Sequence, residues 1–436
     1  MLKRFGRNFA VFALLLVVLV SLVHGDILNL RDVGAVGDGE ADDTAAVQKA
    51  IRMLKKPEYG KLVVPAGTYR ITETVTSQLI GGVVIEGEGK KSILFWGGET
   101  GGTMWRSFGM LHTVFRDLWF RGVPPQAKDP EGRAGILFQA RSVRGGNMNN
   151  RFESMLFTHS EVGVQMGGEN RQEMCNADYS FANVHASHLG TFLRVRNDQG
   201  VDFLVNKFFG VGCGTIFDFQ RGGNLTANNV QLTKCSLYLN IEGGGRNAGT
   251  FVSTNVRHEH PKSYMKGRDQ LLKATDIRWE QAVVKFIGFQ DSQWSWFRRE
   301  SENRWKPLCE IGPGVNVSFE SSIFNGPVAR ISGEEGKPGS LMVRESTFGF
   351  ILPHQAIEAG EHGYFQVRDC FSDHMVPLPN MIKWPERPTM KVTADGTFEH
   401  REVPPVIKGA GEAIEALNKA REKWIRQLEA ENEDAE

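Results

Sequence analysis

The segment Arg257-His258-Glu259-His260 brings together side chains that could do acid–base chemistry. A glycosidase needs one carboxyl group as an acid and a second carboxylate across the bond that it cleaves. A lyase instead needs a base near the sugar proton that it removes and a cation beside the uronate carboxylate. The tetrad offers an acid or base, a carboxylate and a guanidinium, so it is the first candidate for a catalytic centre. The alternative is a solvated polar turn.

The partner carboxylate could come from Glu280 or Asp291, which follow in the next stretch of sequence. With Glu259 as the acid, the separation of the two carboxyl groups would predict retention or inversion at the sugar. His258 or His260 would be the alternative base. These five residues form the predicted catalytic group.

A stretch with two tryptophans and two arginines lies within residues 290–299. Trp294 and Trp296 could stack on sugar rings, because aromatic faces are large and apolar. Arg298 and Arg257 could each bind a uronate carboxylate through paired hydrogen bonds. The stretch is therefore predicted to bind substrate. The alternative is a loop that packs its aromatic side chains on the protein itself.

Polar residues recur at one place in the repeating pattern described below. His159, His258 and Asp291 each lie two residues past a bulky apolar residue, and His185 lies near the same turn. If the coils of the chain stack, such residues line up and could form the floor of a groove for a linear polymer. His159 and His185 would then bind substrate. The alternative is that turns at this place are polar without having a function.

Charge and composition narrow the class of partner. Lys plus Arg total 51 and so do Asp plus Glu, so the formal net charge is zero. This balance argues against nucleic-acid binding through bulk positive charge. With 23% charged and 41% hydrophobic residues, the composition is typical of a globular protein.

The N-terminus predicts export. Three basic residues precede an apolar run from Phe9 to Val20, and the small Gly25 marks a cleavage point. Residues 1–25 are therefore predicted to be a signal peptide, and the protein to be secreted or periplasmic, with no membrane contact after cleavage. The alternative is an uncleaved anchor, since the run is almost as long as the roughly 20 residues that span a bilayer.

The five cysteines show no CxxC spacing and lie in apolar stretches. They are predicted to be small core residues, not a disulfide framework or a zinc site. No cofactor is predicted with certainty, and Ca²⁺ is expected only if the reaction is an elimination.

From about Gly135 onward the sequence repeats two patterns. One is a short alternating strand, and the other ends in a bulky apolar residue followed by polar residues. The bulky residues recur at intervals of 21 to 35 residues, at Phe157, Val184, Phe209, Val230, Val256, Phe289, Phe324, Phe348 and Phe371. A period in the twenties with several short strands per repeat is typical of a β-solenoid. Its coils stack about 4.8 Å apart.

The C-terminal residues no longer follow the repeat. Prolines within residues 385–405 indicate a linker, and residues 412–429 have apolar side chains at helical spacing. The predicted organisation is a β-helix domain over residues 26–395, followed by a linker and a C-terminal helix over residues 396–436.

A short helix is predicted to start near Asp42-Asp43-Thr44, because short polar side chains can cap its free N–H groups. Together with Asp38 these residues form an acidic cluster. Its predicted role is in turns and helix capping. The alternative is a carboxylate pair or a calcium site.

Residues 30–90 contain motifs that resemble the pectate lyase superfamily of right-handed parallel β-helices. In particular they resemble the rhamnogalacturonase/epimerase-like group, which shares its N-terminal coil with polygalacturonases and phage tailspikes. The motifs are residues 32–39, 42–46, 64–69 and 86–89. The resemblance implies an all-β, single-stranded right-handed parallel β-helix that begins with an N-terminal cap, a secreted protein, and polysaccharide substrates.

The catalytic motifs of polygalacturonases do not accompany this resemblance. Asn-Thr-Asp and Gly-His-Gly are absent, and Asp-Asp occurs only at Asp42-Asp43. No catalytic residue can therefore be carried over from the family. The sequence predicts an enzyme that cleaves a pectin-like or other acidic polysaccharide by hydrolysis or β-elimination. The alternative is a non-catalytic binder like an adhesin or tailspike, and a monomer and a side-by-side homotrimer are both open.

Overall fold

The computed structural model describes residues 26–123, 134–143, 145–168, 173, 175–243, 249–259, 270–275, 277, 281–291, 307–349, 356–372, 378, 380–383, 389–392 and 398–401. The predicted leader and C-terminal helix lie outside these residues. Contacts divide the chain into two units, Met1–Gly249 and Thr250–Glu436, which are described separately. Within the described part, no helix has the length and apolar character needed to cross a membrane.

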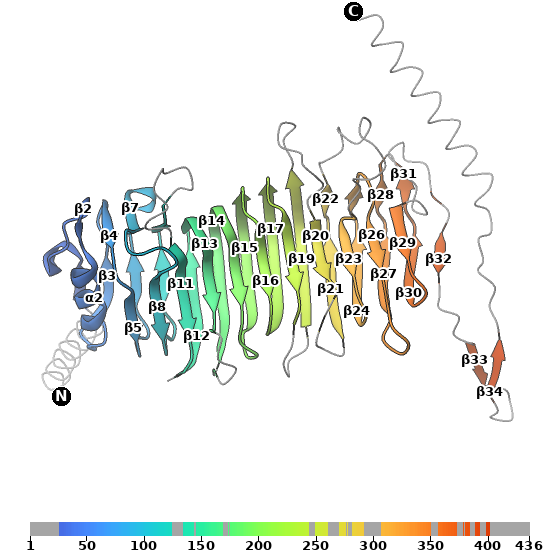
Figure 1. The fold of residues 1–436 in the computed structure, drawn as a ribbon, viewed down its shortest axis with the longest axis horizontal. Helices are drawn as coiled ribbons and strands as arrows, with labels where there is room; N and C mark the ends of the chain where they lie inside the picture. Colours follow the sequence, from blue (N-terminus) through green and yellow to red (C-terminus); the bar gives the residue numbers. More distant parts are fainter. Residues whose placement is uncertain are drawn as a thin grey trace, which may run out of the picture. The chain divides into compact units, whose positions relative to one another are not determined.

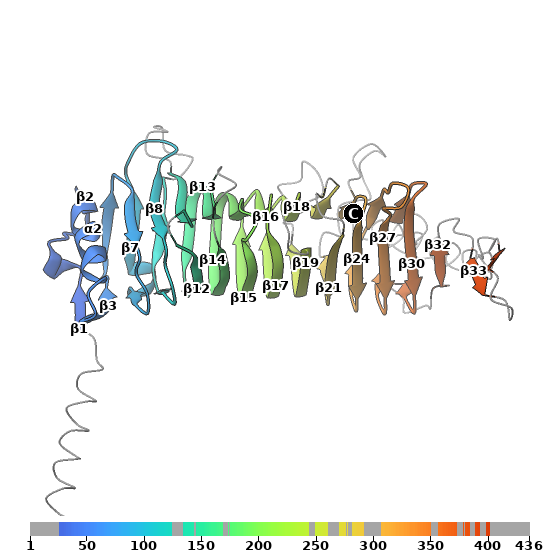
Figure 2. The same cartoon turned by 90° about the horizontal axis from the view of Figure 1, so that it is seen from below.

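Unit 1 is a parallel β-helix whose strands form three faces, here called A, B and C. Face A pairs β1 (Asp26–Asn29), β3 (Tyr59–Val63), β6 (Val84–Glu86), β9 (Val114–Arg116), β12 (Asn147–Glu153) and the first parts of β14 (Asn176–Val195), β15 (Val201–Val211) and β17 (Gly223–Thr233). Figure 1 and Figure 2 show these strands side by side, from blue to green. The fold class predicted from the sequence, a right-handed parallel β-helix, is confirmed.

Faces B and C complete each coil. Face B pairs β2 (Asp38–Asp42), β4 (Gly67–Ile71), β7 (Ser92–Trp96), β10 (Trp119–Arg121), the start of β13 (Leu156–Met166), residues 184–187 of β14 and the later parts of β15 and β17. Face C pairs β5 (Val75–Gln78), β8 (Thr103–Phe108), β11 (Ala134–Arg141), the rest of β13 and β14, β16 (Thr215–Phe219) and β18 (Leu237–Ile241). The long strand β14 therefore passes through all three faces in turn.

The chain turns between faces at single residues with positive φ. At the A–B corner Asn183 has φ 53° and Asn229 has φ 55°. Asn tolerates this left-handed conformation because its short side chain can hydrogen-bond locally. Each corner thus turns the chain with very few residues and keeps neighbouring coils in register.

The interior of unit 1 is a stack of aromatic rings. Phe115, Phe152 and Phe181 lie on successive coils of face A, with centroids 5.2 Å and 5.3 Å apart and nearly parallel planes. Phe138 of face C meets Phe152 edge to face at 5.0 Å. The alternation of side chains along each strand puts these rings inside and the intervening polar residues outside.

The acidic cluster near the N-terminus has the turn role predicted for it. Asp38 Oδ1 accepts hydrogen bonds from two backbone N–H groups, which lower the pKa of its carboxyl. Asp43 precedes helix α2 (Thr44–Met53), yet its carboxylate accepts from the N–H groups of Val36 and Gly37 instead of capping the helix. Short 3-10 turns occur at Arg31–Val33 and Gly89–Lys91. That α2 closes the end of the β-helix stays a prediction.

Unit 2 repeats the parallel pairing with shorter strands. One series is β19 (Gly249–Glu259), β22 (Gln290–Asp291), β25 (Ile323–Phe324), β28 (Thr347–Phe348) and β31 (Phe371–Ser372). The second is β20 (Gln270–Ala274), β23 (Cys309–Ile311), β26 (Ala329–Ile331) and β29 (Ile357–Ala359). The third is β21 (Ala282–Ile287), β24 (Val315–Glu320), β27 (Gly339–Arg344) and β30 (Gly363–Arg368). Antiparallel pairs join β32 (Met381–Lys383) to β30, and β33 (Thr389–Val392) to β34 (Phe398–Arg401).

Two of the bulky repeat residues, Phe209 and Phe371, lie one position away from where the sequence repeat predicts them. Val184 pairs with Phe208, so Phe209 falls one position later and is half-exposed. Phe371 pairs with Thr347, one position before Phe348, and is also half-exposed. Because the side-chain period of a strand is two, a shift of one residue moves a side chain from the core to the surface.

The prediction that the cysteines are small core residues is confirmed for four of them. None of the five forms a disulfide, and all but the half-buried Cys175 are buried. Burial raises the pKa of the Cys370 thiol to about 11. Such thiols act as small apolar fillers.

Candidate functional site

The structure splits the predicted tetrad between the interior and the surface. His258 is 0% exposed, whereas the side chains of Arg257 and Glu259 are 55% and 29% exposed. Arg257 Nε and Glu259 Oε1 form an ion pair of 2.7 Å on the outer side of β19. His258 therefore does not lie beside Glu259 on the outer side, since neighbouring residues of a strand point to opposite sides. Its role as a base stays a prediction.

Asp291 is also buried, with 2% of its surface exposed. It pairs with His258 in the register of β22 and β19. Its Oδ2 accepts from the backbone N–H of Asn325 at 3.3 Å, and the Asn325 side-chain amide donates to its backbone carbonyl. The structure thus brings His258 and Asp291 together inside unit 2. The carboxylate of Asp291 thus does not face solvent, and its predicted catalytic role stays a prediction.

Five predicted site residues lie outside the described part of the chain: His260, Glu280, Trp294, Trp296 and Arg298. Their roles stay predictions. Among the residues that are described, no three His, Cys, Asp or Glu side chains gather as potential ligands of a metal ion.

His159 and His185 lie in unit 1 on the outer side of β13 and β14. His159 stacks on His188 with centroids 5.2 Å apart and planes 10° apart. His185 meets Phe209 edge to face at 5.0 Å. Burial lowers the pKa of both His159 and His185, and His188 and Arg121 lower that of His159 further. These two residues therefore form part of a partly exposed surface.

A depression of about 400 Å³ opens on face A of unit 1. It spans four coils, formed by the strands β9, β12, β14 and β15. Its lining residues are His112, Val114, Asn149, Arg151, Asp178, Tyr179, Ser180, Asp202 and Leu204. These combine carboxylates, an imidazole, a guanidinium and an amide within one concave surface, which is the common form of a ligand site.

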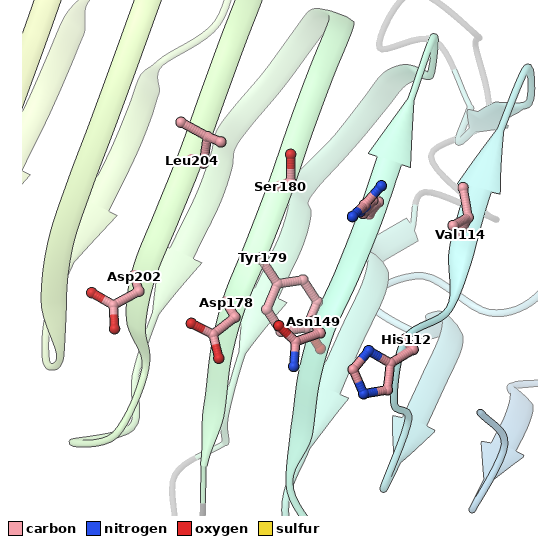
Figure 3. Close-up of a pocket in the computed structure, with 9 residues that line it drawn as sticks. His112, Val114, Asn149, Asp178, Tyr179, Ser180, Asp202 and Leu204 are labelled. Carbon is pink, nitrogen blue, oxygen red and sulfur yellow. The ribbon is translucent and has the colours of Figure 1, made fainter. Parts of the chain in front are cut away.

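One row of the depression follows the corner where the chain enters face A. His112, Asn149, Asp178 and Asp202 occupy this corner on successive coils, and each has a positive φ. Figure 3 shows their side chains following one another along the depression. The register that pairs Tyr179 with Phe203 puts Asp178 opposite Asp202. All four residues of the row are exposed.

A second row lies two residues further along each strand. Val114 pairs with Arg151, Arg151 with Ser180, and Ser180 with Leu204. Arg151 and Leu204 are exposed, the latter by 45%. The depression therefore lies between two rows of side chains. The first row contains charged and amide groups, and the second contains Arg151 and the apolar Val114 and Leu204.

The floor between the two rows is rigid. Tyr179 is fully buried and stacks on Phe203 at 6.3 Å. On the neighbouring coil, the buried Asn150 accepts from the N–H of Thr113 at 3.0 Å and donates to the carbonyl of Met110 at 2.9 Å. Burial raises the pKa of Tyr179, so its hydroxyl stays neutral.

Asp178 and Asp202 are the carboxyl groups of the site. Because they are neighbours in register, their backbones lie about 4.8 Å apart. Asn224, which follows Asp202 in the corner row, donates from Nδ2 to Asp202 Oδ1 at 3.1 Å. Two carboxyl groups at this spacing, open to solvent, can serve as an acid and a nucleophile or base.

Sequence reasoning missed most of this site. None of its lining residues is among the catalytic or substrate-binding residues predicted from the sequence. A usable signal exists, because a polar residue recurs at each corner at positions 112, 149, 178, 202 and 224. The unequal gaps between them hide this row until the coils are aligned.

Comparisons with known proteins agree with this fold. The structure resembles DFA-IIIase from Arthrobacter chlorophenolicus A6 without its lid, with a TM-score of 0.51 and 12% identity, over 82% of this chain and 97% of that chain. It also resembles the N-terminal fragment of bacteriophage Phi29 gene product 12, with a TM-score of 0.52 and 11% identity, over 83% of this chain and 69% of that chain. The class of the protein is thus a right-handed parallel β-helix.

The N-terminal coils also match a known family in sequence. Residues 27–102 match the family described as rhamnogalacturonase A/epimerase, pectate lyase-like. A stretch of 44 residues is 48% identical to mannuronan C5-epimerase AlgE3 of Azotobacter vinelandii, covering 10% of this chain and 2% of the epimerase. The match thus spans only a small part of that relative. The match confirms the resemblance that the motifs of residues 30–90 predicted.

Proposed function

We propose that this protein is a secreted carbohydrate-active β-helix that hydrolyses an acidic, pectin-like polysaccharide in the depression of face A. The observation that carries the proposal is the pair of exposed carboxyl groups, Asp178 and Asp202, at equivalent positions on neighbouring coils. Secretion rests on the basic and apolar N-terminal sequence. The similarity of residues 27–102 to pectate lyase-like proteins supports a polysaccharide as the substrate.

The geometry suggests a role for each side chain. Asp202 is oriented by Asn224 and suits the residue that attacks the sugar. Asp178 would then protonate the departing oxygen. The coil spacing of about 4.8 Å is close to the carboxyl separation of retaining enzymes, so retention of configuration is expected. Arg151 would pair with a uronate carboxylate through its planar guanidinium.

The test is a screen of uronic-acid and neutral polysaccharides with the full chain. Reducing ends and the absorbance of an unsaturated product are read in parallel, with Asp178→Asn/Asp202→Asn as the control. We expect reducing ends without absorbance from an acidic polymer, and none from the double variant with an unchanged circular dichroism spectrum. Both signals together would show elimination and overturn hydrolysis. Binding without any release would overturn the enzyme in favour of a binder.

A further inference from the structure

A second group of cationic and aromatic side chains lies on face B of unit 1. Arg121 ends the strand β10 and pairs in register with Phe95 and Thr158 on the neighbouring coils. Its guanidinium carbon lies 4.7 Å from the ring centroid of Phe95 and 5.3 Å from that of Trp119. All of these side chains except that of Thr158 are half-buried. The two rings hold the guanidinium in place while part of it faces solvent.

Arg121 has no counter-ion within the described residues. Its Nε is buried and has no hydrogen-bond partner there, and burial alone lowers its pKa. Other arginines of the chain differ, since Arg116 pairs with Glu86 and Arg194 with Asp218. A buried donor without a partner is unfavourable, so a bound anion would recover free energy here.

Two histidines lie beside the guanidinium and add imidazole N–H donors. His159 follows Thr158 and stacks on His188 of the next coil at 5.2 Å. The Nδ1 of His159 is buried without a hydrogen-bond partner in the described part of the chain. Besides burial, the groups that shift the pKa of His159 are His188 and Arg121, both of them basic. Among the described residues, no acidic side chain is paired with Arg121 or shifts the pKa of His159.

The neighbouring tryptophan indicates what the anion is attached to. Trp119 is half-exposed, and its Nε1 already donates to Thr158 Oγ1 at 2.8 Å. The N–H of the indole is thus satisfied, and its ring offers an apolar surface beside the guanidinium. A sugar ring can stack on such a surface while its carboxylate reaches the arginine.

We propose that Arg121, Trp119 and the His159–His188 pair form a second binding site that takes a carboxylate-bearing sugar residue. The site lies around the A–B corner from the depression, because β9 and β10 belong to successive faces of one coil. It would anchor an acidic polymer to unit 1 without taking part in its cleavage. The choice of an acidic sugar rests on the proposed function, whereas the anion site itself does not.

Binding is measured by calorimetry with trigalacturonate on the full-length chain carrying Asp178→Asn and Asp202→Asn, so that turnover cannot interfere. We expect a binding event that Arg121→Gln weakens about 10-fold to 100-fold, the usual effect of losing a charge-assisted pair. Arg330→Gln is the matched control, because that arginine already pairs with Glu358, and it should leave binding unchanged. Unchanged binding in Arg121→Gln would overturn the proposal.

A second variant and two further ligands keep the test decisive if Arg121→Gln does not fold or if the chain does not cleave the polymer. If Arg121→Gln fails to fold, the exposed His188→Ala is used, and it should weaken the same binding event. Inorganic phosphate and a neutral glucose trimer separate the ligand classes, since phosphate binding as tightly as the uronate trimer would overturn the sugar assignment. A chain that cleaves nothing yet binds through Arg121 would contradict the proposed function and leave this site standing.

Discussion

The depression in unit 1 and the strands β19 and β22 in unit 2 both contain histidine and aspartate. In unit 1 these side chains face solvent, and in unit 2 they face the interior. In unit 1, His112 and two aspartates occupy corner positions and are exposed. In unit 2, His258 and Asp291 occupy strand positions that point inward and are buried. Whether a residue faces solvent is thus decided by its place in the coil. Residue type alone made the unit 2 segment look like the better site.

The largest expected effect on stability concerns the core under the depression. Phe152 stacks on Phe115 and Phe181, so Phe152→Ala should lower the free energy of unfolding by about 3–5 kcal/mol. Denaturant unfolding followed by circular dichroism measures it. Arg151→Gln, the outward neighbour, should change it by less than about 0.5 kcal/mol. Equal effects of the two changes would contradict the inward and outward assignment.

A smaller effect is expected at the buried aspartate of unit 2. Asp291→Ala removes the acceptor of the Asn325 N–H and should cost about 1–3 kcal/mol of unfolding free energy. Asp291→Asn keeps a carbonyl acceptor and should cost less. The same denaturation experiment compares both variants. A stable Asp291→Ala chain that has lost turnover would restore Asp291 to the site.

The sequence predicted the fold well because the repeat and the N-terminal motifs are local patterns. It predicted the site poorly because the register of a coil cannot be read from spacing that varies from 21 to 35 residues. The repeat aligns Phe209 with Val184, but the residue that pairs with Val184 is Phe208, so Phe209 faces partly outward. For His258 the reason is different, since it lies two residues past the buried Val256 on the same strand and both side chains point inward. Asp178 and Asp202 can be recognised as neighbours only when the register of their two coils is known.

The corner row offers a finer test. Asn224 has φ 63° and donates to Asp202, so Asn224→Ala should cost about 1–2 kcal/mol and lower turnover several-fold. Asn224→Gly tolerates the positive φ and should recover stability without recovering turnover. Stability and rate are measured on the same preparations. Full activity in the glycine variant would mean that Asn224 does not orient Asp202.

The smallest effect is expected for an exposed ion pair. Arg330 and Glu358 pair at 2.9 Å with side chains 57% and 68% exposed. Arg330→Gln should change the free energy of unfolding by about 0–1 kcal/mol, and less in high salt. A larger loss in denaturant unfolding would show that the surface of unit 2 stabilises it more than its exposure suggests.

The most direct test of the account compares the rate of reducing-end release by Asp202→Asn and Glu259→Gln on the acidic polymer that the wild-type chain cleaves. Asp202→Asn should lower the rate about 10³-fold, the scale of losing a catalytic carboxylate. Glu259→Gln should stay near the wild-type rate, since Glu259 is held in an ion pair with Arg257. The reverse result would move the catalytic site from the depression of unit 1 to the end of β19.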